Sequence, residues 1–437
     1  MSRCSRERAL HAVEALSELG ARSAGTPSGH ASAAWVARRL RGLGLQPVVT
    51  EDPERWAYEG RVARLTVTAG PGTEGAESLI LSRAAPFLFS PASSGSASLS
   101  TGLPSSGAYV GARVPRSKEA GAVPPSLILV DPGDDWPRER SLRAGASNKT
   151  PTLAIAQHEG EWIRRCLGEE RELRLDWELH ASARLARART VLATLPARPG
   201  APEGFFLITA HGDSFGGGHG VNGNASGVAV LLEVARAWSA AVREGAIPSP
   251  AREVRFAVWG SRAHSPRVWL SEHLKEQTEP LLGVLNLQNL ALSSGGHRLH
   301  MEPDDHPANS ALIQHACAQL NDAAGRSGLP ERWVTSRSRG AGGLSPFLHS
   351  PSFAPGGIPA MTLFAAGSSE IEEVEGTLGQ PGESWRDLGV VTIPHDPMLG
   401  TRGDADVSRI KDDGALLEAA ARTVLAILPS WLESLPA

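Results

Sequence analysis

The sequence predicts an α/β/α sandwich around a mostly parallel mixed sheet, with a small second domain inserted near its N-terminal side. From residue 190 onward, apolar strand-like runs alternate with helical runs, which is the pattern of a doubly wound α/β domain. From about residue 74 to 182 this alternation is interrupted by a different texture. The 437 residues, 41% of them hydrophobic, are enough for one large domain and an insertion.

The N-terminal segment carries two helices and a strand. Residues 5–19 have apolar side chains at helical spacing, which predicts the first helix. A second helix is expected over 28–43, ending at Gly44, and the apolar segment 45–49 is expected to be a strand.

The interrupting segment is rich in turn-forming residues. Serine, glycine and proline crowd 91–107, which predicts a loop or surface segment. A strand-like run follows at 126–133, and an apolar and then helical run covers 150–167. The segment therefore has strands and a helix of its own.

The C-terminal part supplies the remaining layers of the sandwich. Strands are expected at 190–196, 205–211, 254–260, 281–290 and 358–364, and helices at 225–242, 266–275, 307–324 and 413–432. Because sites in such sheets lie beyond the carboxyl ends of the strands, residues that directly follow these strands are the candidates for function.

Composition excludes several classes of partner. A net charge of -4 gives no reason to expect nucleic acid or an anionic membrane. The three cysteines, Cys4, Cys166 and Cys317, are widely spaced, so neither a disulfide framework nor a thiolate zinc site is expected. The N-terminus lacks the apolar core of a signal peptide, and no run of about 18 apolar residues is found. We expect a cytoplasmic protein; its oligomeric state stays open.

One segment, FFLITAHGDSFGGGHGVNGNASG at 205–227, carries the strongest family signal. It resembles metallopeptidase family 28, the two-zinc aminopeptidases and their relatives. The opening of the chain and the GGIPAMTL run at 356–363 fit the same resemblance. The inserted segment resembles a protease-associated (PA) domain. The expected division is 1–75 and 186–437 for the aminopeptidase-like domain, and 76–185 for the PA-like insertion.

The resemblance also assigns the positions of the zinc ligands. It implies that His211 is the first zinc ligand, with Asp213 beside it. The aspartate that bridges both zincs in the family is here Gly223, although Asn224 and the residues after it stay in register.

The remaining ligand positions have changed as well. Arg262 and Ala263 stand where the family has its Glu-Glu pair, whose first member is the general base. Gln288 stands at the second aspartate, and His395 is the candidate for the last histidine ligand. Four carboxylates have thus become Gly, Arg, Ala and Gln, which changes the formal site charge from about -4 to about +1. We expect no zinc; if any metal binds, His211 and His395 are its expected ligands.

Some of these histidines have a simpler interpretation. His211 is expected to be a hydrogen-bonded residue kept for packing rather than a ligand, and His395 a structural or surface residue. The group of histidines and aspartates at 297–306 is interpreted as a solvated polar loop without a recognised ligand spacing.

Three functions remain open. The leading hypothesis is a non-catalytic peptidase-like protein that binds a peptide or protein partner in the old cleft, the insertion or both. The second is an active zinc aminopeptidase with relocated ligands among Asp213, His264 and Asp396. The third is an enzyme repurposed for peptide tailoring on the same scaffold, which lacks a recognisable replacement base.

Overall fold

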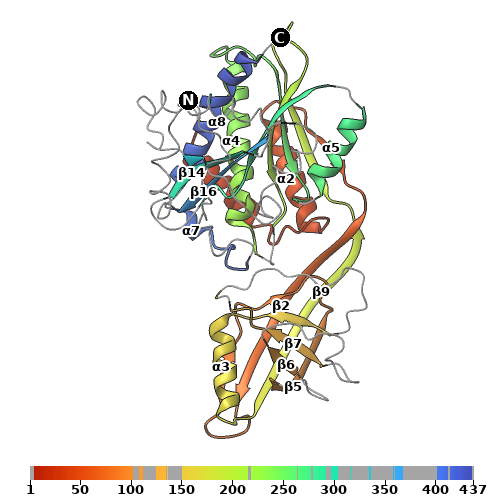
Figure 1. Ribbon diagram of the computed structural model, residues 1–437, viewed down its shortest axis with the longest axis vertical. Coiled ribbons are helices and arrows are strands. Elements are labelled where there is room, and N and C mark those ends of the chain that lie inside the picture. The colour runs from red at the N-terminus through yellow and green to blue at the C-terminus, as the bar shows by residue number, and fades with distance from the viewer. Residues whose placement is uncertain are drawn as a thin grey trace, which may run out of the picture.

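The computed structural model contains two units joined by a narrow ribbon of two strands (Figure 1). It describes residues 4–101, 108–111, 125–133, 135, 150–214, 218–262, 264–276, 279–291, 297–303, 315, 334–335, 358, 360–367, 401–411 and 414–435. Each unit has its own sheet of eight strands and its own apolar core.

The first sheet has the strand order β1-β10-β12-β11-β13-β16-β14-β15. Its strands are β1 (Val48–Glu51), β10 (Arg189–Leu195), β11 (Phe205–His211), β12 (Glu253–Trp259), β13 (Leu281–Leu287), β14 (His297–Pro303), β15 (Val334–Thr335) and β16 (Ala360–Gly367). β11 lies between β12 and β13 and is parallel to both, and β16 is parallel to β13. β10 and β14 are antiparallel to their neighbours β12 and β16, so the predicted α/β class with a mixed sheet is confirmed.

Helices cover both faces of this sheet. They are α1 (Arg6–Ser17), α2 (Pro27–Gly42), the short π-helical turn η1 (Val221–Ala225), α4 (Ser226–Arg243), α5 (Ser265–Glu276), α7 (Ser408–Lys411) and α8 (Gly414–Ser434). Successive residues of β11 face opposite sides. Phe206 and Ile208 pack with α1, α2, α4 and α8, whereas Phe205 packs with α5. The central strands are therefore buried on both faces, as parallel strands usually are.

In the part of the chain that the structure describes, two helices are long and apolar enough to span a membrane by length and composition alone. The stretch Val221–Arg243, which joins η1 and α4, has 89% of its most apolar window buried inside the structure, and α8 has 50%. The apolar character of the first stretch is explained by its position in the core, where α4 contacts α1 and α8.

The second sheet has the order β3-β2-β9-β5-β6-β7-β8-β4. Its strands are β2 (Arg55–Ala69), β3 (Glu77–Ile80), β4 (Ala85–Pro86), β5 (Ser93–Ser100), β6 (Ala108–Gly111), β7 (Leu127–Val130), β8 (Thr152–Ala154) and β9 (Leu173–Ala186). Helix α3 (Gln157–Gly168) packs on it through Ile163 and Cys166. This sheet begins at Arg55, so the expected boundary at residue 75 falls after its first strand. That the unit is a PA-like domain stays a prediction.

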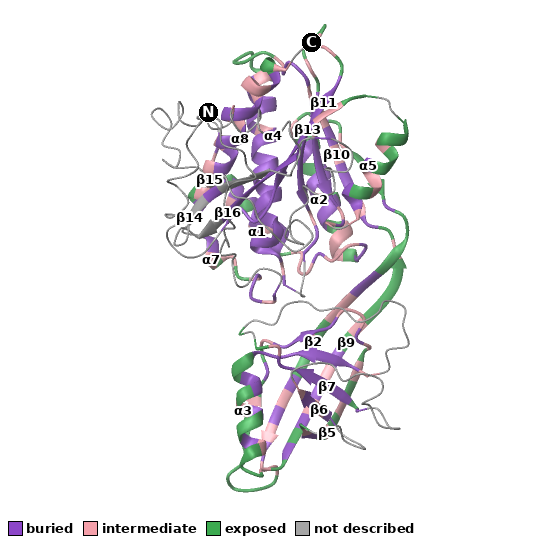
Figure 2. Cartoon of the chain, in the orientation of Figure 1, coloured by how far each residue is buried: buried purple, intermediate pink, exposed green. Residues whose placement is uncertain are grey.

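β2 and β9 form the ribbon between the units. They pair antiparallel along their whole length, from Arg55 opposite Ala186 to Ala69 opposite Leu173. β3 and β5 pair only with their far halves, so near the first unit the two strands pair with each other alone. In this narrow part Trp56 is 45% exposed and its cross-strand partner Leu185 is 55% exposed. Figure 2 shows the change from the buried sheets to the exposed ribbon.

Three local expectations differ from the structure. The strand expected at 45–49 lies at Val48–Glu51 as the edge strand β1, next to β10. The polar loop expected at 297–306 is wrong at its start, because His297–Pro303 forms β14 and pairs with β16. Polar side chains at alternate positions of an outer strand resemble a loop in sequence. The helix expected over 307–324 lies, apart from residue 315, outside the described residues.

Candidate functional site

The ends of three neighbouring parallel strands bring the predicted site residues together. His211 is the last residue of β11, Arg262 follows β12, and Gln288 follows β13 directly. His211 is paired in register with Trp259 of β12. Because parallel strands end at the same edge of the sheet, these side chains gather at the carboxyl edge, where open α/β sheets place their sites.

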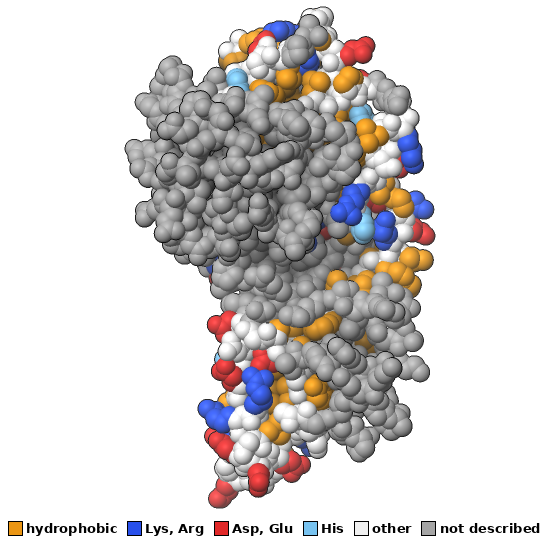
Figure 3. Space-filling model, in the orientation of Figure 1, with side chains coloured by type: hydrophobic (Ala, Val, Ile, Leu, Met, Phe, Trp, Pro, Cys, Tyr) orange, Lys and Arg blue, Asp and Glu red, His pale blue; other side chains and the backbone are white. Residues whose placement is uncertain are grey.

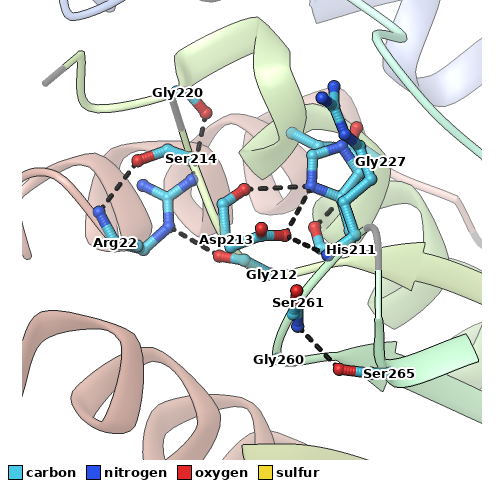
Figure 4. Close-up of polar contacts among 12 residues, drawn as sticks. Arg22, His211, Gly212, Asp213, Ser214, Gly220, Gly227, Gly260, Ser261 and Ser265 are labelled. Carbon is cyan, nitrogen blue, oxygen red and sulfur yellow. Dashed lines mark hydrogen bonds and ion pairs between the residues drawn. The ribbon is translucent and has the colours of Figure 1, made fainter. Parts of the chain in front are cut away.

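His211 is held by Asp213. The imidazole Nδ1 lies 3.0 Å from Asp213 Oδ1 and 3.0 Å from the Asp213 carbonyl oxygen. Since both partners are acceptors, Nδ1 carries the proton and Nε2 keeps its lone pair. Burial lowers the pKa of His211; Asp213 opposes this shift and the charge of Arg262 adds to it. His211 is therefore neutral at pH 7, and Figure 4 shows its ring next to Asp213.

The second role of Asp213 is to fix the start of the segment after β12. The backbone N–H of Arg262 donates to Asp213 Oδ1 at 3.0 Å. The same carboxylate oxygen therefore accepts from both His211 and Arg262. Asp213 is buried, with 4% of its surface exposed. The Arg262 backbone, at the position predicted for the general base, is linked to the histidine through this aspartate.

Asn224 joins the start of α4 to the end of β13. Its Oδ1 accepts the backbone N–H groups of Gly227, at 3.1 Å, and Asn289, at 2.9 Å. Its Nδ2 donates to the carbonyl of Leu287 at 3.0 Å. The amide thus caps the helix and binds the neighbouring strand end, which explains an asparagine that is fully buried.

Gly223, at the bridging position, is held by a carboxylate from a distant part of the chain. Asp404 accepts the backbone N–H of Gly223 through Oδ2 and that of Asn222 through Oδ1, both at 2.8 Å. Its backbone carbonyl accepts the N–H of Val221 at 3.1 Å. Asp404 is buried, with 1% of its surface exposed, and its three hydrogen bonds to main-chain N–H groups fix this loop.

A buried arginine also holds the glycine-rich loop, through hydrogen bonds to its carbonyl groups. Arg22 is 1% exposed, and its guanidinium donates to the carbonyls of Gly212 and Gly220, both at 3.1 Å, and also to that of His219. Its backbone N–H donates to Ser214 Oγ at 2.8 Å. Figure 4 shows Arg22 and His211 on opposite sides of Asp213.

The charge of Arg22 is balanced inside the protein. Burial lowers its pKa to about 10, and the carboxylates of Asp404 and Asp213 oppose that shift. The guanidinium therefore stays charged at pH 7. The buried guanidinium in turn stabilises the negative charges of both aspartates, so these charges offset one another without a bound ion.

The other predicted site residues have separate places. Gln288 is 1% exposed, and its Oε1 accepts from Asn286 Nδ2 at 3.2 Å. His264 lies half-buried just before α5, and burial lowers its pKa, with Arg55 and Arg267 adding to the shift. Ala263, His395 and Asp396 lie outside the described residues.

The described side chains do not fit a two-zinc centre. Such a centre needs bridging and terminal carboxylates that neutralise two dications. Here His211 offers one imidazole nitrogen, Gln288 offers a neutral amide, and Arg262 adds a positive charge that lowers the pKa of His211. Within the described ranges, no three His, Cys, Asp or Glu side chains converge as a metal-binding group.

Two residues of this network, Arg22 and Asp404, could not be found from the sequence. Asp404 lies 181 positions after Gly223, and Arg22 lies 190 positions before Gly212. Each sits in a polar turn-like segment that looks like surface in sequence. Only the fold brings these charges to the glycine-rich loop.

Comparison with known proteins agrees with this architecture. Residues 190–338 match Peptidase family M28. A curated relative, the "Probable lipoprotein aminopeptidase LpqL" of Mycobacterium tuberculosis, is 30% identical over 261 residues, which cover 55% of this chain and 49% of that protein. The chain thus matches about half the length of this relative.

Solved structures show the same fold. An aminopeptidase from Aneurinibacillus sp. strain AM-1 superposes with a TM-score of 0.59 at 17% identity, covering 100% of this chain and 97% of that chain. A peptidase M28 precursor from Shewanella amazonensis gives a TM-score of 0.61 at 16% identity, with coverage of 97% and 92%. At such identities the likeness concerns the fold alone.

The fold and the strand-end site define the class as an aminopeptidase-like α/β protein. The chain is similar to peptidase family M28 over residues 190–338 and to the curated aminopeptidase over about half of its length, and it shares the fold of solved aminopeptidase structures.

Proposed function

We propose that this chain is a non-catalytic peptidase-like protein whose scaffold binds a peptide or protein partner. The proposal rests on one observation: the carboxylates at the old metal site are used by the framework. Asp213 accepts from Arg262 N–H and holds His211, and Asp404 accepts the N–H groups beside the bridging position.

This use of carboxylates leaves the family chemistry without its parts among the described residues. A general base must reach the attacking water, and here that position carries Arg262, a guanidinium that stays protonated. The bridging position carries Gly223, which has no side chain. The backbone around these positions is nevertheless kept in place by Asn224 and Asp404, which supports binding rather than catalysis as the retained property.

Turnover of a chromogenic aminopeptidase substrate, leucine p-nitroanilide, tests this proposal. We expect no turnover above buffer, whether or not zinc is added. Hydrolysis that is abolished both by a chelator and by His211→Ala would overturn the proposal and establish an active zinc aminopeptidase with relocated ligands. The matched control is His158→Ala, an exposed histidine on α3 in the second unit, which should leave any turnover by the chain unchanged.

A further inference from the structure

A pocket of about 410 Å³ lies where the ribbon meets the first unit. Its walls come from four segments that are distant in sequence: residues 21–28 at the start of α2, residues 86–88 at the end of β4, and residues of β2 and of β9. A volume of this size is at the lower end of ligand-binding pockets, which are often found between domains. It is large enough for two or three residues of a peptide.

The apolar side of the pocket is rigid. Tyr58 is 6% exposed and its hydroxyl donates to the carbonyl of Ser90 at 3.0 Å. Its ring lies over Gly60, where a Cβ would come within 2.7 Å of Tyr58 Cε1. Since no side chain fits at Gly60 without moving the ring, the glycine allows Tyr58 to lie flat against the ribbon. Tyr58 can thus present a fixed aromatic surface.

The loop next to Tyr58 is held in an unusual conformation. Phe89 has φ 67°, the left-handed region that a bulky side chain rarely adopts. It packs on Tyr58 with ring centroids 5.7 Å apart, and Ser90 Oγ accepts the N–H of Thr152 at 2.8 Å. Such local strain is found where a loop is preorganised for a ligand. The neighbouring Leu88 and Pro86 complete the apolar wall.

The side of the pocket that is formed by charged and polar residues of the ribbon is close to neutral. Glu59, Arg61 and His180 line it, and Arg61 is the cross-strand partner of His180. His180 also lies 3.1 Å from Glu178. Because a carboxylate and a guanidinium offset one another, this side does not favour a strongly anionic or cationic ligand. Hydrogen-bonding groups of both kinds beside an apolar wall suit the backbone of a peptide.

The pocket also shares a wall with the remnant site. Ala21 and Ser23 line the pocket, while Arg22 between them exchanges hydrogen bonds with Ser214, at 2.8 and 3.2 Å. Ser214 directly follows Asp213. A chain seated in the pocket would therefore lie one short segment away from the old catalytic edge.

We propose that this junction pocket binds a short extended peptide segment, seating one medium-sized apolar side chain against Tyr58, Pro86 and Leu88. The inference rests on the proposed function, because it names where and what the scaffold binds. The backbone of the segment lies toward Glu59, Arg61 and His180. Figure 3 shows hydrophobic and charged side chains close together on the visible surface of the described residues.

Photo-crosslinking tests the proposal on the full-length chain. The probe is the blocked tripeptide acetyl-Ala-photoleucine-Ala-amide, and adducts are located by peptide mass spectrometry. We expect adducts on peptides that contain Tyr58, Leu88 or His180, and competition by acetyl-Ala-Leu-Ala-amide but not by acetyl-Ala-Asp-Ala-amide. Adducts confined to other parts of the chain, or equal competition by both peptides, would contradict the proposal that this pocket binds a peptide.

Two variants separate pocket binding from surface labelling. Ser182→Trp fills the pocket from its exposed rim and should lower the adduct yield by at least about fivefold. Ser94→Trp, an exposed serine on β5 that does not line the pocket, should not change it. If Ser182→Trp fails to fold, Leu88→Glu makes the same test by placing a charge on the apolar wall. Unchanged labelling in a folded pocket variant contradicts the proposal.

Failure of this inference and failure of the proposed function give different results. If the chain is zinc-free, shows no turnover and forms no adducts in the pocket, the proposed function stands and the proposal of a peptide pocket is wrong. A chain with chelator-sensitive turnover and pocket adducts loses the proposed function and keeps the pocket.

Discussion

The remnant site and the ribbon differ in what they bury. The site buries polar side chains that are hydrogen-bonded, whereas the ribbon leaves apolar side chains exposed. At the site, His211, Asn224 and Asp404 are each at most 1% exposed and hydrogen-bonded to the backbone or to each other. On the ribbon, Trp56 and Leu185 are apolar and about half exposed. The site is therefore held by direct polar contacts between chain segments, whereas the ribbon exposes apolar side chains instead of burying them in a core.

This difference explains how the ligand positions could change while the fold was kept. Asn224 and Asp404 bind main-chain groups, whose positions do not depend on a metal. Replacing the side chains at 223, 262 and 288 leaves those contacts in place. The comparison predicts that metal ligands can be introduced without disturbing these main-chain contacts, and that removing the contacts strongly destabilises the domain.

Rebuilding the site is the largest expected effect. The quadruple variant Gly223→Asp, Arg262→Glu, Ala263→Glu and Gln288→Asp should bind zinc with a dissociation constant of about 1 μM or tighter, roughly 8 kcal/mol. The backbone at residue 223 has φ -109°, which an aspartate can adopt. Isothermal titration with zinc measures the affinity.

The control for that variant keeps the arginine. A triple variant with Arg262 in place should bind zinc at least about tenfold more weakly, because the guanidinium repels a dication. If the quadruple variant is folded and takes up no zinc, the assignment of the ligand positions is wrong.

Removing the Asp404 carboxylate, which holds the loop at Asn222 and Gly223, should have the next largest effect. Asp404→Ala leaves the N–H groups of Asn222 and Gly223 without their acceptor and takes a counter-charge from Arg22. We expect a loss of about 3–5 kcal/mol in the free energy of unfolding, measured by chemical denaturation. The neighbouring Asp406 is exposed and its carboxylate accepts the N–H of Ser408, so Asp406→Ala should cost at most about 1 kcal/mol. Equal losses for both variants would contradict the role of Asp404.

The pH dependence of stability should report the buried imidazole. Since the pKa of His211 is lowered below 6.5 in the folded protein, the unfolded chain binds the proton more readily. Its contribution to stability is therefore complete above pH 6.5 and is lost as the pH falls below that value. Between pH of about 7 and 5.5, the wild type should lose about 1 kcal/mol more than His211→Gln. Parallel stability profiles of the two proteins would show that His211 is not buried in its neutral form.

The smallest effect is expected on the ribbon. Trp56→Ser should change the free energy of unfolding by at most about 0.5 kcal/mol, because the exposed side chain supports little core. Trp177, on β9 and 4% exposed in the core of the second unit, is the matched control, and Trp177→Ser should cost about 3 kcal/mol or more. A large loss in Trp56→Ser would mean that the ribbon is a structural support rather than a free surface.

The sequence predicted the α/β class and the strands that carry His211, Arg262 and Gln288, because buried parallel strands are continuous apolar runs and their ends are marked by polar residues. The expected boundary at residue 75 lies after β2, because this strand runs through both the ribbon and the second sheet without a change in sequence composition. Arg22 and Asp404 were missed because their partners are set by tertiary contacts, which local patterns do not encode.

The zinc content of untagged protein purified without chelator tests the central claim most directly. Elemental analysis should give moles of zinc per mole of chain close to zero, since the described donors at the strand ends include one imidazole and no uncommitted carboxylate at the family positions. A value of about one or two would contradict the account and indicate a retained metal centre with relocated ligands.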